Sequence, residues 1–271
     1  MKTRLRRGSP PLHIRGVAVV VLLATIGCSL IGPAAEVGEL RTKSESVPLG
    51  DAESVHVEIN MAAGELAISG GANDLMEADF TYNVEELEPE VDYREGQLVV
   101  RTPDAGLRIG SLWNLDDYRY EWDLRFNDDV PMEMKVEVAA GKANLHLGSL
   151  SLASVEIGTG ASEVEVDLAD SSSLTSLNID AGVGQTTVDL SGDWQDDLDA
   201  NISSGVGELS VRLPPRVCVR VEVDEGLGEV RTQGLANDGG VYVNDACGSS
   251  DVTLRIDVSA GVGAVNLEVG E

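Results

Sequence analysis

One sequence pattern recurs along most of the chain and limits how it can fold. It consists of an alternating polar and apolar run, a corner in which two small residues flank an apolar one, and a second alternating run. Alternate side chains of a β-strand face opposite sides, so each copy has one apolar and one polar face. A single copy cannot bury its apolar face, whereas a stack of copies can. The clearest copies are NIDAGVGQTTVDL (178–190), NISSGVGELSVRL (201–213), EVDEGLGEVRT (222–232) and DVSAGVGAVNLEV (257–269), and the weaker ones are EVAAGKANLHL (137–147), EIGTGASEVEVDL (156–168) and EINMAAGELAIS (58–69).

The spacing of these copies indicates stacked units. From the corner at Gly141 to the one at Gly226, successive corners are 19, 22, 23 and 21 residues apart. No stretch shows a helical periodicity of apolar residues. We therefore predict an all-β chain folded as a β-solenoid with repeats of about 20 residues. The first small residues of the corners are Ala62, Gly141, Gly160, Gly182, Gly205, Gly226 and Gly261.

The corners also have a predicted geometry. Glycine permits backbone conformations with positive φ and the close approach of a neighbouring chain. The apolar residue between the two small ones is expected to point into the core. These residues are Val183, Val206, Leu227 and Val262.

The stretch around Gly184 resembles the end of a phosphate-binding glycine loop, but it lacks the residues that bind phosphate. In the motif G-x-x-x-x-G-K-[ST], a lysine reaches the phosphates and a helix follows. Here Gln185 occupies the lysine position, Ile179 stands where the first glycine belongs, and an alternating strand pattern follows. The sequence therefore predicts no nucleotide binding.

Residues 1–28 have the composition of an export signal, with a basic start followed by the uncharged apolar run 16–32. Cys28 follows Thr25-Ile26-Gly27, which resembles the lipobox of bacterial lipoproteins. We therefore predict that Cys28 is lipidated and that the protein is extracytoplasmic and membrane-anchored, in the periplasm or at the cell surface. The alternative is an uncleaved anchor, because this apolar run is close to the length of about 17 residues that just spans a bilayer.

Three further segments follow the leader. Residues 29–47 are polar and aperiodic, which predicts a tether, and residues 48–271 form the predicted β-solenoid domain. Within this domain, residues 48–130 form an irregular part, because the glycine corner is absent from most of it, and residues 131–271 hold the regular repeats.

The charge of the exported part excludes some partners. Five of the 19 basic residues and none of the 47 acidic residues lie in 1–28, which leaves 14 − 47 = −33 for the remainder. Such a field repels nucleic acids and anionic membrane surfaces, so neither is expected as a binding partner. The acidic residues alternate along the strands, which is typical of a solvated outer face.

Two groups of side chains have alternative interpretations. Cys218 and Cys247 lie in the exported part, where disulfides persist, so they form either a disulfide or two buried free thiols. The aromatic residues near position 120 either fill the core of the stack or stack on sugar rings or a protein partner. The candidates for binding are Trp113, Tyr118, Tyr120 and Trp122.

No catalytic or metal-binding motif stands out, and no cofactor is predicted. The exported part has no H-x-x-x-H or paired-cysteine spacing. The acidic turns Asn127-Asp128-Asp129 and Asp196-Asp197 offer oxygen ligands for calcium, but they do not match the nonapeptide calcium repeat of other solenoids. We therefore predict no metal site, with calcium at these turns as the alternative.

Residues 47–83 (VPLGDAESVHVEINMAAGELAISGGANDLMEADFTYN) resemble the N-terminal domain of the bacterial toast-rack family. Residues 120–168 are similar to the same family and to adhesin-like and cell-wall-active-antibiotic response proteins. The resemblance implies an extracytoplasmic, right-handed single-stranded β-helix without known enzymatic activity. The antibiotic-response relatives carry several transmembrane helices before their β domain, whereas this chain has at most one apolar segment, which argues against a role in stress regulation.

Two hypotheses for function follow. The first is a non-enzymatic, membrane-anchored surface protein whose β domain binds an envelope protein or a glycan in the manner of an adhesin. The second is a β-helical enzyme acting on polysaccharide, which needs a cleft where carboxylates and basic groups converge. Because the basic residues are scattered along the sequence, we favour the first.

Overall fold

The structure is a computed structural model, and it describes residues 37–50, 53–104, 117–169, 171 and 173–270. Within these residues the chain is all-β, with a short 3-10 turn, η2 (Glu85–Leu87), between β4 (Met76–Tyr82) and β5 (Glu90–Arg94). None of the helical segments in the described part is long and apolar enough to cross a membrane. The prediction of an all-β chain is confirmed, and most of the strand pairs are parallel.

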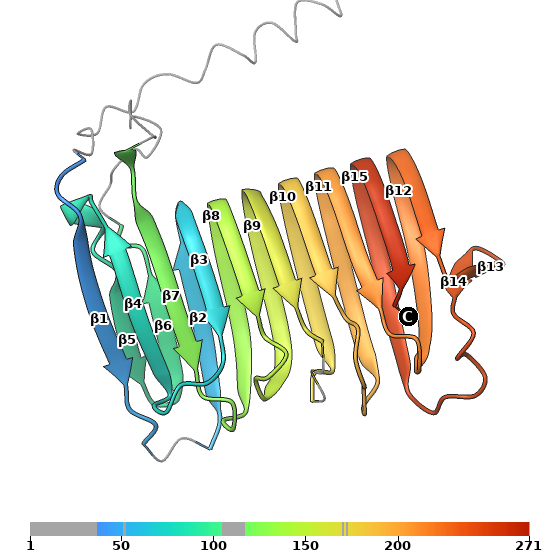
Figure 1. Cartoon of the computed structure of the whole chain (residues 1–271), viewed down its shortest axis with the longest axis horizontal. Coiled ribbons are helices and arrows are strands. Elements are labelled where there is room, and N and C mark those ends of the chain that lie inside the picture. Colours follow the sequence, from blue (N-terminus) through green and yellow to red (C-terminus); the bar gives the residue numbers. More distant parts are fainter. Residues whose placement is uncertain (1–36, 51–52, 105–116, 170, 172, 271) are drawn as a thin grey trace, which may run out of the picture.

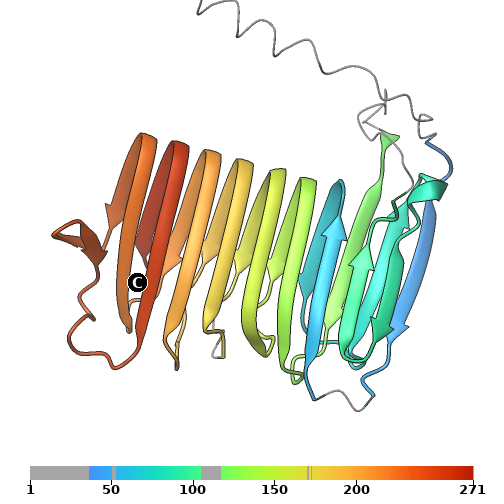
Figure 2. The same cartoon turned by 180° about the vertical axis from the view of Figure 1, so that it is seen from behind.

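Six long strands form the regular part of the molecule, and they lie side by side in parallel (Figure 1). They are β8 (Met132–His146), β9 (Leu152–Asp167), β10 (Ser176–Asp189), β11 (Leu198–Leu213), β12 (Cys218–Gln233) and β15 (Thr253–Val269). Each strand bends in its middle, so its two halves belong to two opposite faces of the stack, as the views from the front and from behind show (Figures 1 and 2).

The burial pattern explains why each long strand bends. In β10, Leu177, Ile179 and Ala181 are buried before the corner, and Thr186 and Val188 are buried after it. The buried positions therefore change from odd to even residue numbers across the corner. A straight strand would place these two sets on opposite sides, whereas the bend points both sets into the same core.

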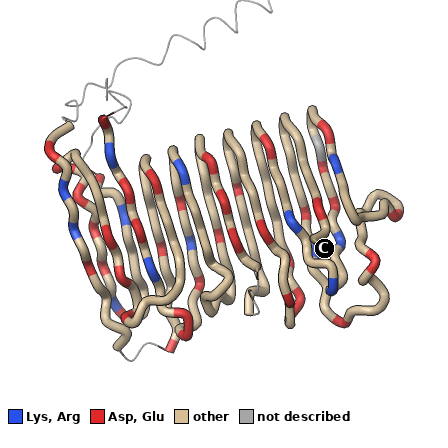
Figure 3. The backbone as a smooth tube through the Cα atoms, viewed as in Figure 1, with Lys and Arg blue, Asp and Glu red and all other residues tan. Residues whose placement is uncertain are grey.

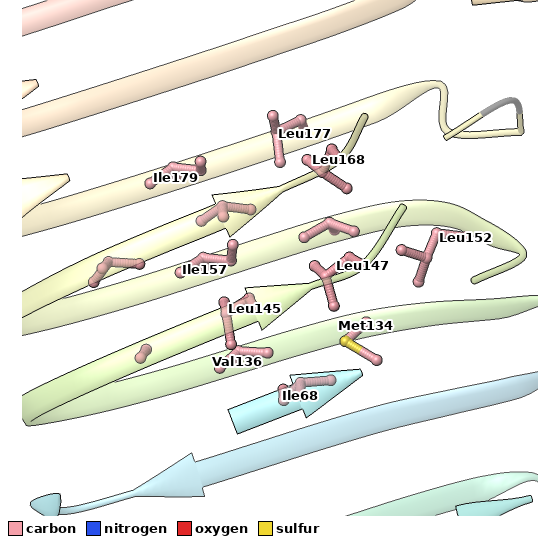
Figure 4. Packing of buried hydrophobic residues seen from close by; sticks show 14 of the residues in the cluster. Ile68, Met134, Val136, Leu145, Leu147, Leu152, Ile157, Leu168, Leu177 and Ile179 are labelled. Carbon is pink, nitrogen blue, oxygen red and sulfur yellow. The ribbon is translucent and has the colours of Figure 1, made fainter. Parts of the chain in front are cut away.

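The core lies between the two faces and is made of aliphatic side chains from successive strands. Figure 4 shows Leu145 and Leu147 of the β8 segment beside Leu152 and Ile157 of β9 and Ile179 of β10. Each of these residues is no more than 1% exposed. Full burial of one such side chain contributes roughly 1.5–3 kcal/mol, so the stack of apolar side chains is the main source of stability.

The N-terminal part completes the two faces with short strands. They are β1 (Arg41–Val47), β2 (Val55–Met61), β3 (Gly64–Ser69), β4 (Met76–Tyr82), β5 (Glu90–Arg94), β6 (Gln97–Arg101) and β7 (Tyr120–Phe126). β2 and β3 act as one bent strand interrupted at the corner, because both pair with β8. One face then continues as β3–β7–β4–β1 and the other as β2–β6–β5, with antiparallel pairs among them.

β1 corrects the prediction of a polar tether for residues 41–47, and residues 29–36 of that segment lie outside the described residues. Arg41–Val47 pair with β4 in antiparallel register, with Arg41 opposite Tyr82 and Val47 opposite Met76. The segment has no apolar alternation in the sequence because its side chains are polar on both sides of the strand except for the buried Val47.

The order of the strands at the C-terminal end differs from their order in the sequence. β15 lies between β11 and β12, so Val262 is in register with Val206 on one side and with Leu227 on the other. Beyond β12 lie the short strands β14 (Val241–Val243) and β13 (Ala236–Asp238), which pair with each other. On β12, the pairing with β14 is limited to Arg220–Glu222. The chain therefore runs to the end of the stack in β12 and then returns, so that β15 occupies the place between β11 and β12.

A disulfide and a buried amide hold this returning segment to β12. The Sγ atoms of Cys218 and Cys247 are 2.04 Å apart. The side chain of Asn244 is buried, donates hydrogen bonds to the carbonyl oxygens of Pro214 and Val217, and accepts one from the amide of Val219 at 3.0 Å.

Candidate binding surface

The glycine corners bring neighbouring backbones into close contact. The second glycines of three corners, Gly184, Gly207 and Gly263, have φ of 141°, 145° and 150°. A Cβ atom at Gly207 would overlap the carbonyl oxygen of Gly184 on the adjacent strand, and one at Gly263 would overlap that of Gly207. Both the backbone conformation and the lack of space therefore require glycine at these positions.

The residue at the apex of each corner points outward, so the prediction that it faces the core is wrong. Val183, Val206, Val262 and Leu227 are 56%, 47%, 47% and 74% exposed. The inside of the bend in β10 is already filled by Ala181 and Thr186, which are 7% and 3% exposed. At a convex bend packed in this way, the apex side chain can only turn toward solvent.

Strand register aligns these exposed side chains into one continuous line. Ala161 lies beside Val183, Val183 beside Val206, Val206 beside Val262, and Val262 beside Leu227. Neighbouring strands are about 4.8 Å apart, so the line is roughly 19 Å long. We call these five residues the apolar crest.

A shallow groove follows the crest on the side that precedes the apex. One hollow of about 430 Å³ is lined by the corner glycines Gly182, Gly205, Gly226 and Gly261 and by small neighbours such as Ser203. A second hollow of about 440 Å³ is lined by residues of the earlier corners, among them Gly158, Gly160 and Ala139. Gly158 is in register with Asp180 of the first hollow, so the two hollows lie on the same side of the corners.

Acidic side chains lie on both sides of the crest. Glu163, Glu208 and Glu229 stand two residues after the apex of their strands and are exposed. Asp180 and Asp224 precede the apex and line the groove. Figure 3 shows that acidic residues are spread over the whole stack and that basic residues are few. A partner that fits this surface has apolar side chains and positive charge.

A different hollow, of about 700 Å³, lies at the N-terminal end among β1, β5 and β6. It has acidic and basic side chains, as the enzyme hypothesis requires, but most of them pair with each other. The Nζ atom of Lys43 is 3.2 Å from a carboxylate oxygen of Glu45 and 3.2 Å from one of Glu88, and Arg101 is 2.7 Å from Glu90. The hydrogen bond from Lys43 is the main cause that lowers the pKa of Glu88. A general acid in glycoside hydrolysis needs the opposite shift.

The aromatic candidates separate into core and surface residues. Tyr120 and Trp122 are each 2% exposed, with ring centroids 5.5 Å apart, so they belong to the core and are no longer candidates for binding. Tyr118 is half-buried, donates a hydrogen bond to the carbonyl oxygen of Ala63 at 3.1 Å, and has a pKa raised to about 12 by burial. Trp113 lies outside the described residues.

The remaining sequence-predicted sites are placed as follows. Cys28 lies outside the described residues, and Cys218 and Cys247 form the disulfide at the end of the stack. In the part of the chain that the structure describes, no three His, Cys, Asp or Glu side chains are grouped as metal ligands. The acidic turns have other contacts, because Asp128 accepts a hydrogen bond from Ser149 and Asp197 accepts one from the amide of Thr253.

The sequence contains a signal for the outward direction of the crest, and this signal is a change in the phase of the apolar alternation. The apolar positions of residues 177–181 are odd and those of residues 186–190 are even. Two inward runs of opposite phase require a bend between them, and the residue at the centre of a bend has no core to face. The phase change, rather than the hydrophobicity of Val183, indicates its direction.

Comparisons with known proteins agree with this architecture. The family described as "N-terminal domain of toast_rack, DUF2154" matches residues 36–173 and 170–212. A crystal structure described as a "putative cell adhesion protein" from Clostridium sporogenes is 27% identical, with a TM-score of 0.65, and covers 86% of this chain and 100% of its own.

Two further solved structures match less closely. Two proteins each described as a "putative adhesin", from Bacteroides fragilis and Parabacteroides merdae, are 8% and 10% identical with TM-scores of 0.36 and 0.34. They cover 87% and 86% of this chain and 100% and 97% of their own. These two scores are too low to establish a common fold. Among curated proteins, none matches the chain.

Proposed function

Because the chain belongs to the toast-rack family, whose N-terminal domain spans more than half of it, we propose that it is a non-enzymatic, adhesin-like surface protein. In this proposal the stack of bent strands is a β-solenoid, the right-handed single-stranded β-helix that the family resemblance implies. It acts as a rigid scaffold that presents the apolar crest to a partner in the cell envelope. The exposed line from Ala161 to Leu227 is the observation that carries the proposal.

The chemistry of the crest favours a protein partner over a glycan. Sugar rings are usually held by exposed aromatic faces, and Tyr120 and Trp122 are buried. Exposed aliphatic side chains in a continuous line are typical of protein interaction sites. The flanking acids then select a surface that carries Lys or Arg.

A capture experiment with envelope extract tests the crest. The exported domain with Val206→Ser and Val262→Ser should lose most of the protein that the wild-type domain retains, and raised salt should also reduce capture. The matched control carries Asn201→Ser and Asp257→Ser on the same two strands, at exposed positions that are in register with each other. Equal capture by the crest variant and the control would contradict the proposal.

The likeness to a cell adhesion protein and the disulfide favour an extracytoplasmic location, because disulfides persist outside the cytoplasm. We place the protein at the membrane through lipid on Cys28. A single acyl chain holds a protein only marginally, and each buried CH₂ adds about 0.8 kcal/mol, so several chains give durable anchoring.

Changing Cys28→Ser tests this anchor. The variant should not incorporate labelled fatty acid. It should also keep its leader, and mass spectrometry of the intact protein would detect this. If both labelling and mass match the wild type, an uncleaved N-terminal anchor replaces the lipid and the function of the crest is unaffected.

A further inference from the structure

In the last unit of the stack, one side of β12 is paired over only part of its length. β12 pairs with β15 along its whole length on one side. On its other side, the described residues provide only β14, which covers Arg220–Glu222. The second half of β12, after the corner at Leu227, therefore has a free edge. Figure 1 shows β14 and β13 lying beyond β12 at this end of the molecule.

The inward side chains of this free half lack the cover that the same positions have elsewhere. Val230 and Thr232 are in register with Val265 and Leu267, which are each 1% exposed. Val230 is only partly buried and Thr232 is exposed, because no strand follows them. A strand added here would cover both.

An added strand would face β14, which already extends the opposite face of the stack at this end. Tyr242 of β14 is paired with Val221 of β12, whose side chain is fully buried, so Tyr242 lies on the core side of its sheet. Tyr242 is partly buried against the core. β14 thus supplies the next strand of one face, while the next strand of the other face is missing.

The N-terminal end of the stack contrasts with this open edge. Its edge strand β1 carries Lys43 and Glu45 in register with the buried Phe80 and Ala78, so both charges are on the inward side. Inward charges are a common device that prevents a sheet edge from pairing with another chain. The second half of β12 has no such charge, because Glu229 and Arg231 alternate with the inward Val230 and Thr232 and are exposed.

We propose that the free half of β12 binds an extended segment of a partner protein, which adds as a strand and completes this last unit. Backbone hydrogen bonds would supply much of the affinity, as in other cases of strand addition. The segment alternates apolar side chains, which cover Val230 and pack toward Tyr242, with polar ones that face solvent. A second copy of this chain fits less well, because β14 and β13 project beyond β12 on the other face, where a second stack would have to lie.

A peptide with the chain's own strand pattern is the probe. Residues 263–269 (GAVNLEV) already pair with β12 on its other side, so a capped, dye-labelled peptide of this sequence has the required alternation. Anisotropy measured at constant peptide and increasing protein should show saturable binding. Thr232→Lys places a charge on the inward side of the edge and should weaken binding roughly tenfold or more.

Two controls separate strand addition from other binding. Gln233→Lys adds the same charge at the next position of the same strand, facing outward, and should leave the affinity within about twofold. A peptide with proline in place of leucine should not bind, because proline cannot donate a ladder hydrogen bond. The crest variant Val206→Ser with Val262→Ser should bind the peptide normally, so the result is independent of the proposed function.

Three outcomes would overturn the proposal. One is the absence of saturable binding to the wild-type protein, and another is equal binding by the wild type and Thr232→Lys. The third is a concentration-dependent dimer in sedimentation that Thr232→Lys abolishes, which would make a second copy the occupant of the edge.

Discussion

Two neighbouring residues of a corner have opposite requirements. Gly207 must be glycine because its φ is positive and its neighbour's carbonyl oxygen occupies the space of a Cβ. Val206, one position earlier, faces solvent and has no packing reason to be apolar. A structural constraint and an exposed functional candidate thus stand side by side in the same short motif.

Replacing Gly207 by Val should therefore destabilise the fold, whereas Val206→Ala should not. Strain at a positive φ costs about 1–3 kcal/mol, and overlap with Gly184 adds to it. A surface truncation such as Val206→Ala stays within about 0.5 kcal/mol. Urea unfolding of both variants measures the difference, and equal midpoints would show that the corner tolerates a side chain.

At the scale of elements, the alternating runs predicted the long strands, but they could not predict the strand order. Gly205, Gly261 and Gly226 are equivalent in register, so β12 could pair with β11 in the same way as β15 does. The local pattern does not distinguish these neighbours. The difference lies in smaller features: β15 has Leu267 where β12 has Thr232, and a polar residue suits the end position better.

The crest, which is the candidate site, could also be predicted only in part from the sequence. Its residues are predictable from their repeated position, but their direction depends on how the bend packs, since Ala181 and Thr186 take the space inside it. The polar strand β1 could not be predicted because it lacks an apolar alternation, and it is held by pairing with β4 instead.

The disulfide should stabilise the unusual strand order. Cys218 and Cys247 are 29 residues apart, and closing a loop of this size contributes about 3–4 kcal/mol on the chain-entropy estimate. Cys247→Ser should lower the free energy of unfolding by about this amount. A reductant should have the same effect on the wild type and none on the variant, and an effect on both would point to a different target.

Asp197 gives the start of β15 a dependence on pH. The pKa of its carboxyl is lowered, first by the hydrogen bond from the amide of Thr253 and also by Arg255. A lowered pKa means that the ionised form stabilises the fold above the unfolded value of about 3.9, and that this contribution disappears as the pH falls through the folded pKa.

Asp197→Asn should therefore lower the melting temperature at pH 7 and make less difference near pH 3. Asp196→Asn, at the neighbouring exposed position, is the matched control and should have little effect at either pH. A constant difference between Asp197→Asn and the wild type at both pH values would contradict the role of the charge.

At the scale of the whole molecule, the acidic surface acts against compactness. The full chain has a net charge of −28, and charge of one sign destabilises a compact state through self-repulsion. Most of the ion pairs among the described residues are exposed, like Arg255 with Asp197 at 3.2 Å, and such pairs contribute little.

Salt should therefore raise the stability of the domain. Between 0.01 M and 0.15 M ionic strength the Debye length falls from about 30 Å to about 8 Å, which screens repulsion across the stack more than it weakens adjacent pairs. Thermal unfolding in a NaCl series measures this. A melting temperature that falls with salt would show that the ion pairs outweigh the repulsion.

The position of β15 between β11 and β12 has a consequence for the order in which the chain can complete its fold. Synthesis from the N-terminus produces β12 before β15, the strand that separates it from β11. The final part of the fold therefore cannot form, and the sheet keeps an open place, until residues 253–269 have been made. A chain truncated before residue 253 would keep that place open, with the facing edges of β11 and β12 unpaired.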